Sequence, residues 1–148
     1  MDEFDRFVND LQEKIFDEAR EAYGEKGFER WRNPRFNGPM PSANGHGRLT
    51  GECGDTIEIF LKFDNDRVIA ASYMTDGCAS SAICGSFAAE LSMGRDPEAL
   101  TDITGDAVLA AIGRLPESDH HCAGLAAASL QEAVNSYMKQ CVQRGKTA

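Results

Sequence analysis

The sequence predicts an α+β domain in which helices pack on one face of a small antiparallel sheet. Two patterns support this prediction. A stretch in the middle of the chain alternates between apolar and polar residues, and the stretches before and after it carry apolar residues at helical spacing. Strands followed by helices are typical of this class, because a sheet with one apolar face needs helices to cover it. A chain of 148 residues suits one core, so we expect a single domain over residues 1–148.

The N-terminal part predicts an amphipathic helix over residues 1–23 and then a loop over residues 24–44. Apolar residues recur every three or four positions in the helix and leave an acidic outer face. They are Phe4, Val8, Leu11, Ile15, Ala19 and Ala22. The loop is predicted because glycine and proline interrupt regular structure. These residues are Gly27, Pro34, Gly38, Pro39 and Pro41.

An α+β core is predicted over residues 45–148. "HGRLTGE" suits a short first strand, and "TIEIFLKF" and "RVIAASYM", joined by the turn "DNDR", predict an antiparallel hairpin. A helical run follows Cys78 and ends at Gly94, which suits a C-capping position. "DPEAL" and "TGDAVLAAIG" predict two short helices, and a long last helix follows Pro116. Its apolar side is formed by Leu130, Val134, Tyr137, Met138 and Cys141.

Charge and composition narrow the function. The net charge of −9 argues against binding to nucleic acid or to an anionic membrane, since both attract basic surfaces. No apolar run approaches the roughly 20 residues of a membrane-spanning helix. The first 20 residues hold seven acidic side chains and no apolar block, which is unlike a targeting peptide and indicates a cytoplasmic protein. Five cysteines, an odd number, favour metal or thiol chemistry over a disulfide framework in that compartment.

Three groups of candidate ligands stand at predicted element ends: "CGD" before the hairpin, "DGC" after it and "HHC" at the last helix. In extended chain, Cys53 and Asp55 face the same point about 7 Å apart. A helix N-terminus favours the thiolate form of Cys78 and Cys122. Three thiolates with Asp55 or His121 would make a site that Zn²⁺ accepts, and thiolates also hold iron–sulfur clusters. Residue types and spacing leave two alternatives equally open: a metal site, or scattered core cysteines beside a histidine helix cap.

Longer motifs favour the metal site. The segments "RWRNPRFNG", "CGD", "DGCASSAI" and "LPESDHHC" occur in this order, and together they resemble the IscU/NifU-type iron–sulfur cluster assembly scaffold family over residues 30–140. The resemblance implies a three-stranded antiparallel sheet with helices packed on it, the IscU/SufE-like fold. It places the family's cluster-binding residues at Cys53, Asp55, Cys78, His121 and Cys122, with Cys122 as the acceptor of persulfide sulfur. The insertion typical of the SufU-like branch, between the second and third cysteines, is absent.

The resemblance also implies a function. The protein would assemble a transient 2Fe–2S cluster from iron and sulfur that a cysteine desulfurase delivers, with an electron donor such as ferredoxin, and pass the cluster to recipient apo-proteins. It would not be an enzyme with a substrate of its own, and the apo form could bind Zn²⁺. "LPESD" replaces the family's lysine-ended chaperone motif, so we expect weak chaperone binding. The alternative is a zinc-binding structural or regulatory protein that uses the same ligands. The sequence leaves monomer and dimer equally open.

Overall fold

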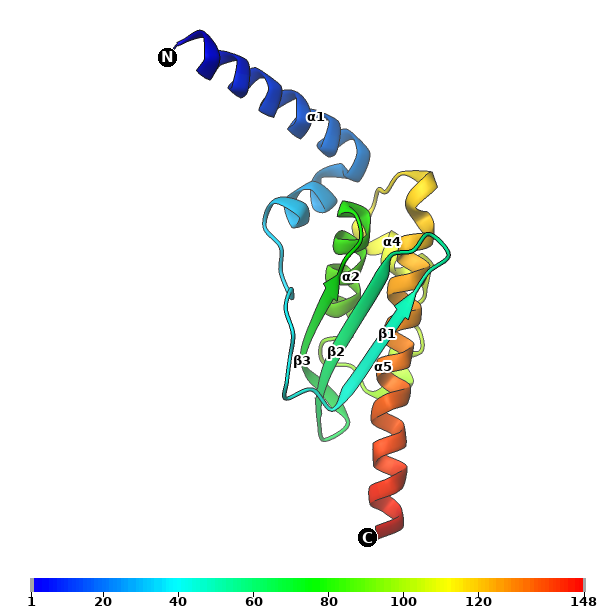
Figure 1. The fold of residues 1–148 in the computed structure, drawn as a ribbon. Helices are drawn as coiled ribbons and strands as arrows, with labels where there is room; N and C mark the ends of the chain where they lie inside the picture. Colours follow the sequence, from blue (N-terminus) through cyan, green and yellow to red (C-terminus); the bar gives the residue numbers. More distant parts are fainter. Residues whose placement is uncertain (1, 148) are drawn as a thin grey trace.

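The alternating residues in the middle of the chain form one three-stranded antiparallel sheet, which confirms the predicted fold class (Figure 1). The computed structural model describes residues 2–147, and side chains as far as residue 145. The strands are β1 (Gly45–Thr50), β2 (Thr56–Asp64) and β3 (Arg67–Thr75), in the order β1-β2-β3. Every second residue of β2 is buried, as its alternation predicts. The short first strand and the hairpin are both confirmed.

Helices cover the inner face of this sheet. The helices after the sheet are α2 (Ala79–Ser92), α3 (Pro97–Leu100), α4 (Gly105–Ile112) and α5 (His120–Thr147), with a 3₁₀ turn, η1 (Glu117–Asp119), before α5. Of these, α2 and α5 pack on the sheet, and α3 and α4 pack on those two helices. The long helix α5 packs against β1 and β2, and α2 packs against β3. β1 lies so close to α5 that a Cβ atom on Gly45 would come within 2.7 Å of the Ala133 carbonyl oxygen. Glycine at this position is therefore required for the close approach of strand and helix.

The N-terminal helix is longer than predicted, and the loop prediction is wrong over residues 25–32. Helix α1 (Glu3–Arg32) is broken at Gly24, where φ is 73°, and then continues to Arg32. Its second part persists because it packs on the body of the protein. Phe28 is buried there, and the buried Arg30 side chain bonds to α2. Tertiary packing thus outweighs the helix-breaking tendency of Gly27.

The remaining loop protects the sheet edge. The Tyr73 backbone N–H donates to the Phe36 carbonyl, and the Gly38 N–H donates to the Tyr73 carbonyl at 3.0 Å. Asn37 and Tyr73 form an isolated parallel bridge. Residues 36–38 therefore satisfy the outer edge of β3, which would otherwise be open to pairing with another strand.

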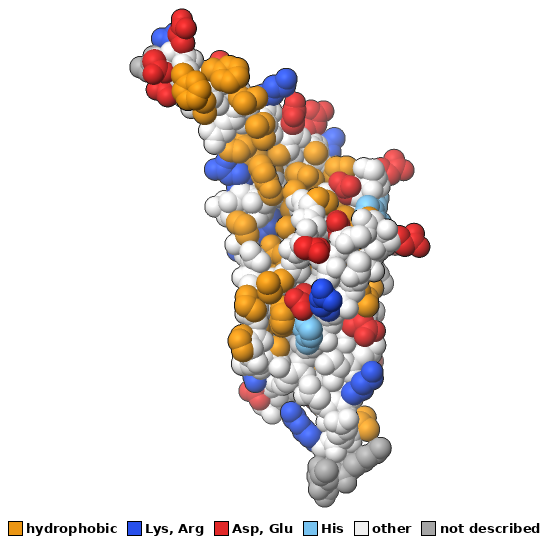
Figure 2. Space-filling view, in the orientation of Figure 1, with side chains coloured by type: hydrophobic (Ala, Val, Ile, Leu, Met, Phe, Trp, Pro, Cys, Tyr) orange, Lys and Arg blue, Asp and Glu red, His pale blue; other side chains and the backbone are white. Residues whose placement is uncertain are grey.

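The outer part of α1 extends away from the sheet and exposes its apolar stripe (Figures 1 and 2). Phe4 is 70% exposed and Phe7 is 64% exposed. The helical spacing was predicted correctly, but no described part of the chain covers this stripe. Met138, predicted on the apolar side of the last helix, is 43% exposed, whereas its neighbour Tyr137 is buried and stacks on Phe63 of β2. Among the described helices, none is both long and apolar enough to cross a membrane.

Candidate metal centre

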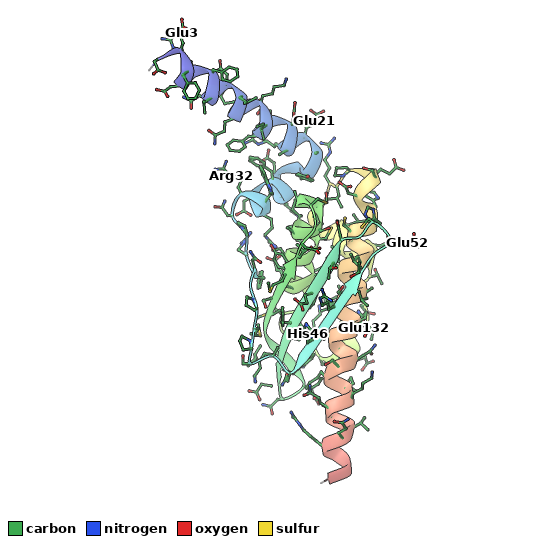
Figure 3. All side chains as sticks on the ribbon, viewed as in Figure 1. Glu3, Glu21, Arg32, His46, Glu52 and Glu132 are labelled. Atoms are coloured by element: carbon green, nitrogen blue, oxygen red, sulfur yellow. The ribbon has the colours of Figure 1, made fainter. Side chains whose placement is uncertain are left out.

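Three segments that are distant in sequence meet at one end of the sheet. They are the loop between β1 and β2, the first turn of α2, and the first turn of α5 (Figure 3, where Glu52 marks the loop). The loop brings Asp55, α2 begins after Cys78, and α5 carries Cys122. One oxygen of Asp55 and the two sulfur atoms lie within 4.8 Å of one another. Two thiol groups and a carboxylate at this separation form a candidate metal centre.

Hydrogen bonds fix the carboxylate beside the thiols. The Ser81 hydroxyl donates to Oδ2 of Asp55 at 2.9 Å, and the Cys78 thiol lies 3.8 Å from the same oxygen. The Ser81 oxygen is also 3.5 Å from the Cys122 sulfur. Gly77 leaves room for this arrangement, because a Cβ atom there would lie 2.7 Å from the Asp55 carboxyl carbon. These contacts therefore fix the position of the Asp55 carboxylate relative to the two thiols.

Cys122 is the most deeply buried of these groups. Its exposed fraction is 0%, and burial raises the pKa of its thiol to about 11. The hydrogen bond from Ser81 lowers this pKa, while the nearby Cys78, Asp119 and Asp55 raise it. The prediction that the helix N-terminus favours the Cys122 thiolate is therefore wrong in its net direction. A metal ion that binds here must displace the thiol proton.

Cys53 and His121 lie beside this group. The chain turns tightly over residues 51–55, where the Gly54 N–H donates to the Gly51 carbonyl and Gly54 has φ of 90°. The extended geometry assumed for Cys53 and Asp55 is therefore wrong. Cys53 is exposed and lines an open groove of about 700 Å³ together with His121. His121 approaches the centre more closely, with its Nε2 atom 3.6 Å from the Cys122 sulfur.

Sequence reasoning missed two serines that join the segments of the site. Ser80 donates to Oδ2 of Asp119 at 2.7 Å, so the start of α2 is tied to the turn before α5, while Ser81 ties it to Asp55. Both serines are fully buried although they are polar. Because buried hydroxyls usually have partners, two consecutive serines after a candidate ligand could have drawn attention. Cys84 is fully buried in α2, and burial raises the pKa of its thiol.

These burial differences predict an order of thiol modification. With iodoacetamide at neutral pH, exposed Cys53 and Cys78 should react first, and Cys122 and Cys84 at least about tenfold more slowly. Peptide mass spectrometry during the reaction would measure each rate, and denatured protein, in which the four rates converge, is the control. Modification of Cys122 as fast as Cys53 would contradict the buried position of Cys122.

The fold and the site together define a class of protein: a small α+β domain with a thiol and carboxylate metal centre at one end of its sheet. Residues 22–144 match the model of the NifU-like N terminal domain. The chain is 35% identical over 119 residues to iron–sulfur cluster assembly scaffold protein IscU 1 of Archaeoglobus fulgidus, covering 80% of this chain and 78% of that protein. It is 30% identical to the scaffold protein IscU of Aquifex aeolicus, with the same coverage of each.

The crystal structure of the N-terminal part of a NifU-like protein from Brucella abortus has the same fold. Its TM-score is 0.64 at 16% identity, over 82% of this chain and 97% of that one. The chain therefore belongs to the NifU-like N-terminal domain family. The predicted resemblance is confirmed.

Proposed function

We propose that this protein is a scaffold on which an iron–sulfur cluster is assembled and from which the cluster passes to other proteins. The observation that carries the proposal is the convergence of Asp55, Cys78 and Cys122 within 4.8 Å. Scaffold proteins for cluster assembly are also the relatives that this chain resembles over most of its length. Thiol ligands suit cluster iron, and the carboxylate is a weaker partner that favours release.

The cargo is a 2Fe–2S cluster in this proposal. In this proposal Cys53, Cys78 and Cys122 supply three thiolates, and Asp55 or His121 supplies the fourth ligand. The turn at Gly54 is the element that would have to open for Cys53 to join, whereas His121 already touches Cys122. Cys78 is exposed at the edge of the group, which leaves the site accessible to iron and to acceptors.

Sulfur arrives on Cys122 from the persulfide of a cysteine desulfurase. The Cys122 sulfur attacks the terminal sulfur of that persulfide, the donor sulfur–sulfur bond breaks, and the donor leaves as a thiolate. Because Cys122 is fully buried and its pKa is about 11, the desulfurase must first uncover this thiol and accept or relay its proton. The delivered sulfur must then be reduced to sulfide, which is the task of an electron donor such as ferredoxin.

Anaerobic reconstitution tests this function. The protein would be incubated with iron, cysteine and a desulfurase, and iron and acid-labile sulfide would be counted beside the visible spectrum. Equal amounts of iron and sulfide, with release of both to an apo-ferredoxin, are expected. Zinc uptake without any assembly of sulfide would reject the scaffold and support the alternative, a zinc-binding protein with the same ligands.

Chaperone binding should be weak. Leu115 of the "LPESD" segment is buried, and His120 bonds to its carbonyl at 3.0 Å, so the segment is held on the body of the protein. The lysine that ends the family's motif is Asp119 here, and this aspartate accepts a hydrogen bond from Ser80. Calorimetric titration with the chaperone that serves IscU proteins should give a Kd no tighter than about 100 μM. Micromolar binding that is lost on Pro116→Ala would contradict this expectation.

A further inference from the structure

Ser81 stands at the centre of the site without being a ligand itself. Its side chain is fully buried in the first turn of α2, and its oxygen is within hydrogen-bonding distance of Asp55 and Cys122. The Cys78 sulfur lies 4.0 Å away. One hydroxyl group therefore touches all three members of the group.

The geometry gives this hydroxyl a preferred partner. A serine has one proton to donate, and the 2.9 Å contact to the Asp55 carboxylate is shorter than the 3.5 Å contact to the Cys122 sulfur. The Cys78 thiol also points to Oδ2 of Asp55. Both contacts engage Oδ2, the carboxylate oxygen that faces the thiols.

We propose that Ser81 is a positioning residue that holds the Asp55 carboxylate toward the two thiols and so toward the bound metal. The proposal uses the candidate metal centre of the proposed function and adds how its carboxylate is oriented. A carboxylate on a loop can rotate freely, whereas one held by a buried hydroxyl enters the site already oriented.

Gly77 provides an independent sign that this contact is built into the fold. A Cβ atom at Gly77 would lie 2.7 Å from the Asp55 carboxyl carbon and 2.8 Å from the Ser81 oxygen. Any larger residue there must push the two side chains apart. Gly77→Ala is therefore a second way to break the contact while both partners remain.

Binding of Co²⁺ to the apo-protein tests the proposal, since cobalt bound to thiolates gives strong visible absorption. Ser81→Ala should weaken Co²⁺ binding by about 10- to 100-fold, the usual effect of losing a hydrogen bond that orients a metal ligand. Gly77→Ala should weaken it in the same direction. Ser92→Ala is the matched control: it removes an equally buried hydroxyl at the other end of α2, whose partner is the Ala89 carbonyl, outside the group. It should leave affinity and spectrum unchanged.

A double-mutant cycle separates orientation from general damage. If Ser81 acts through Asp55, Ser81→Ala should change Co²⁺ affinity less than about twofold in an Asp55→Ala background. Additive effects of the two substitutions, or an equal loss in Ser92→Ala, would overturn the proposal. Failure of the unaltered protein to bind Co²⁺ would overturn it together with the metal centre. Normal cobalt behaviour without any cluster assembly would reject only the scaffold function.

Discussion

Cys122→Ser and Cys78→Ser should each abolish stable cluster assembly. Both sulfur atoms belong to the group that converges at the end of the sheet. A serine hydroxyl keeps the size of the side chain but does not ionise as a thiol does, and its hard oxygen is a poor ligand for sulfide-bridged iron. After anaerobic reconstitution, bound iron and acid-labile sulfide should fall by more than about tenfold, since losing a ligand exceeds the effect of losing a neighbouring hydrogen bond.

Cys141→Ser is the control for this experiment, because Cys141 lies far along α5 and outside the group. Cys53→Ser addresses the cysteine that the structure leaves at the rim of the groove. Loss of the cluster in that variant would mean that the turn at Gly54 opens during assembly. Normal loading in any two of the Cys53, Cys78 and Cys122 variants would reject the site.

Asp55→Ala should make the bound cluster longer lived and its transfer slower. The carboxylate adds negative charge beside two thiols in partly buried surroundings, and its presence already contributes to the raised pKa of Cys122. It is also a hard oxygen ligand, which binds a divalent ion such as Co²⁺ well but matches cluster iron poorly. Without it, His121 can take the vacant position and bind the iron more firmly.

The decay of visible absorption in air and the rate of transfer to apo-ferredoxin would be measured side by side for both proteins. Asp55→Asn is the useful companion, because it keeps the shape and removes the charge. Faster loss of the cluster from Asp55→Ala would show that the cluster needs Asp55 as a ligand. The lability of the cluster would then arise at His121.

The sheet and the identity of the site could be predicted from sequence for different reasons. In β2, alternation of apolar and polar residues is a direct imprint of burial on one face, so the strand was found with its inward side chains. Asp55, Cys78 and Cys122 were found because they stand at element ends, which meet at one edge of the sheet. The local sequence pattern was sufficient to predict an element where buried and exposed positions alternate regularly along it, as in β2.

Other features depend on tertiary contacts that no local pattern shows. Gly27 was taken as a breaker, yet the helix continues there because Phe28 and Arg30 are buried against the body. The direction of Cys53 depends on the positive φ at Gly54, which glycine allows but does not impose. The proposed role of Ser81 depends on two partners from other segments, so its place after Cys78 could draw attention to it but could not show what it contacts.

The three segments that carry the candidate ligands are distant in sequence. Binding of a metal ion or cluster to them therefore affects the free energy of unfolding. An unfolded chain holds these side chains apart, so metal or cluster binds the native state and stabilises it by mass action. With free ligand at about 100 times its Kd, the gain is about 2.7 kcal/mol, or roughly 5–10 °C in Tm for a chain of this size. The cluster-bound protein is therefore more resistant to unfolding and proteolysis than the apo-protein. Transfer of the cluster returns the protein to its less stable apo form.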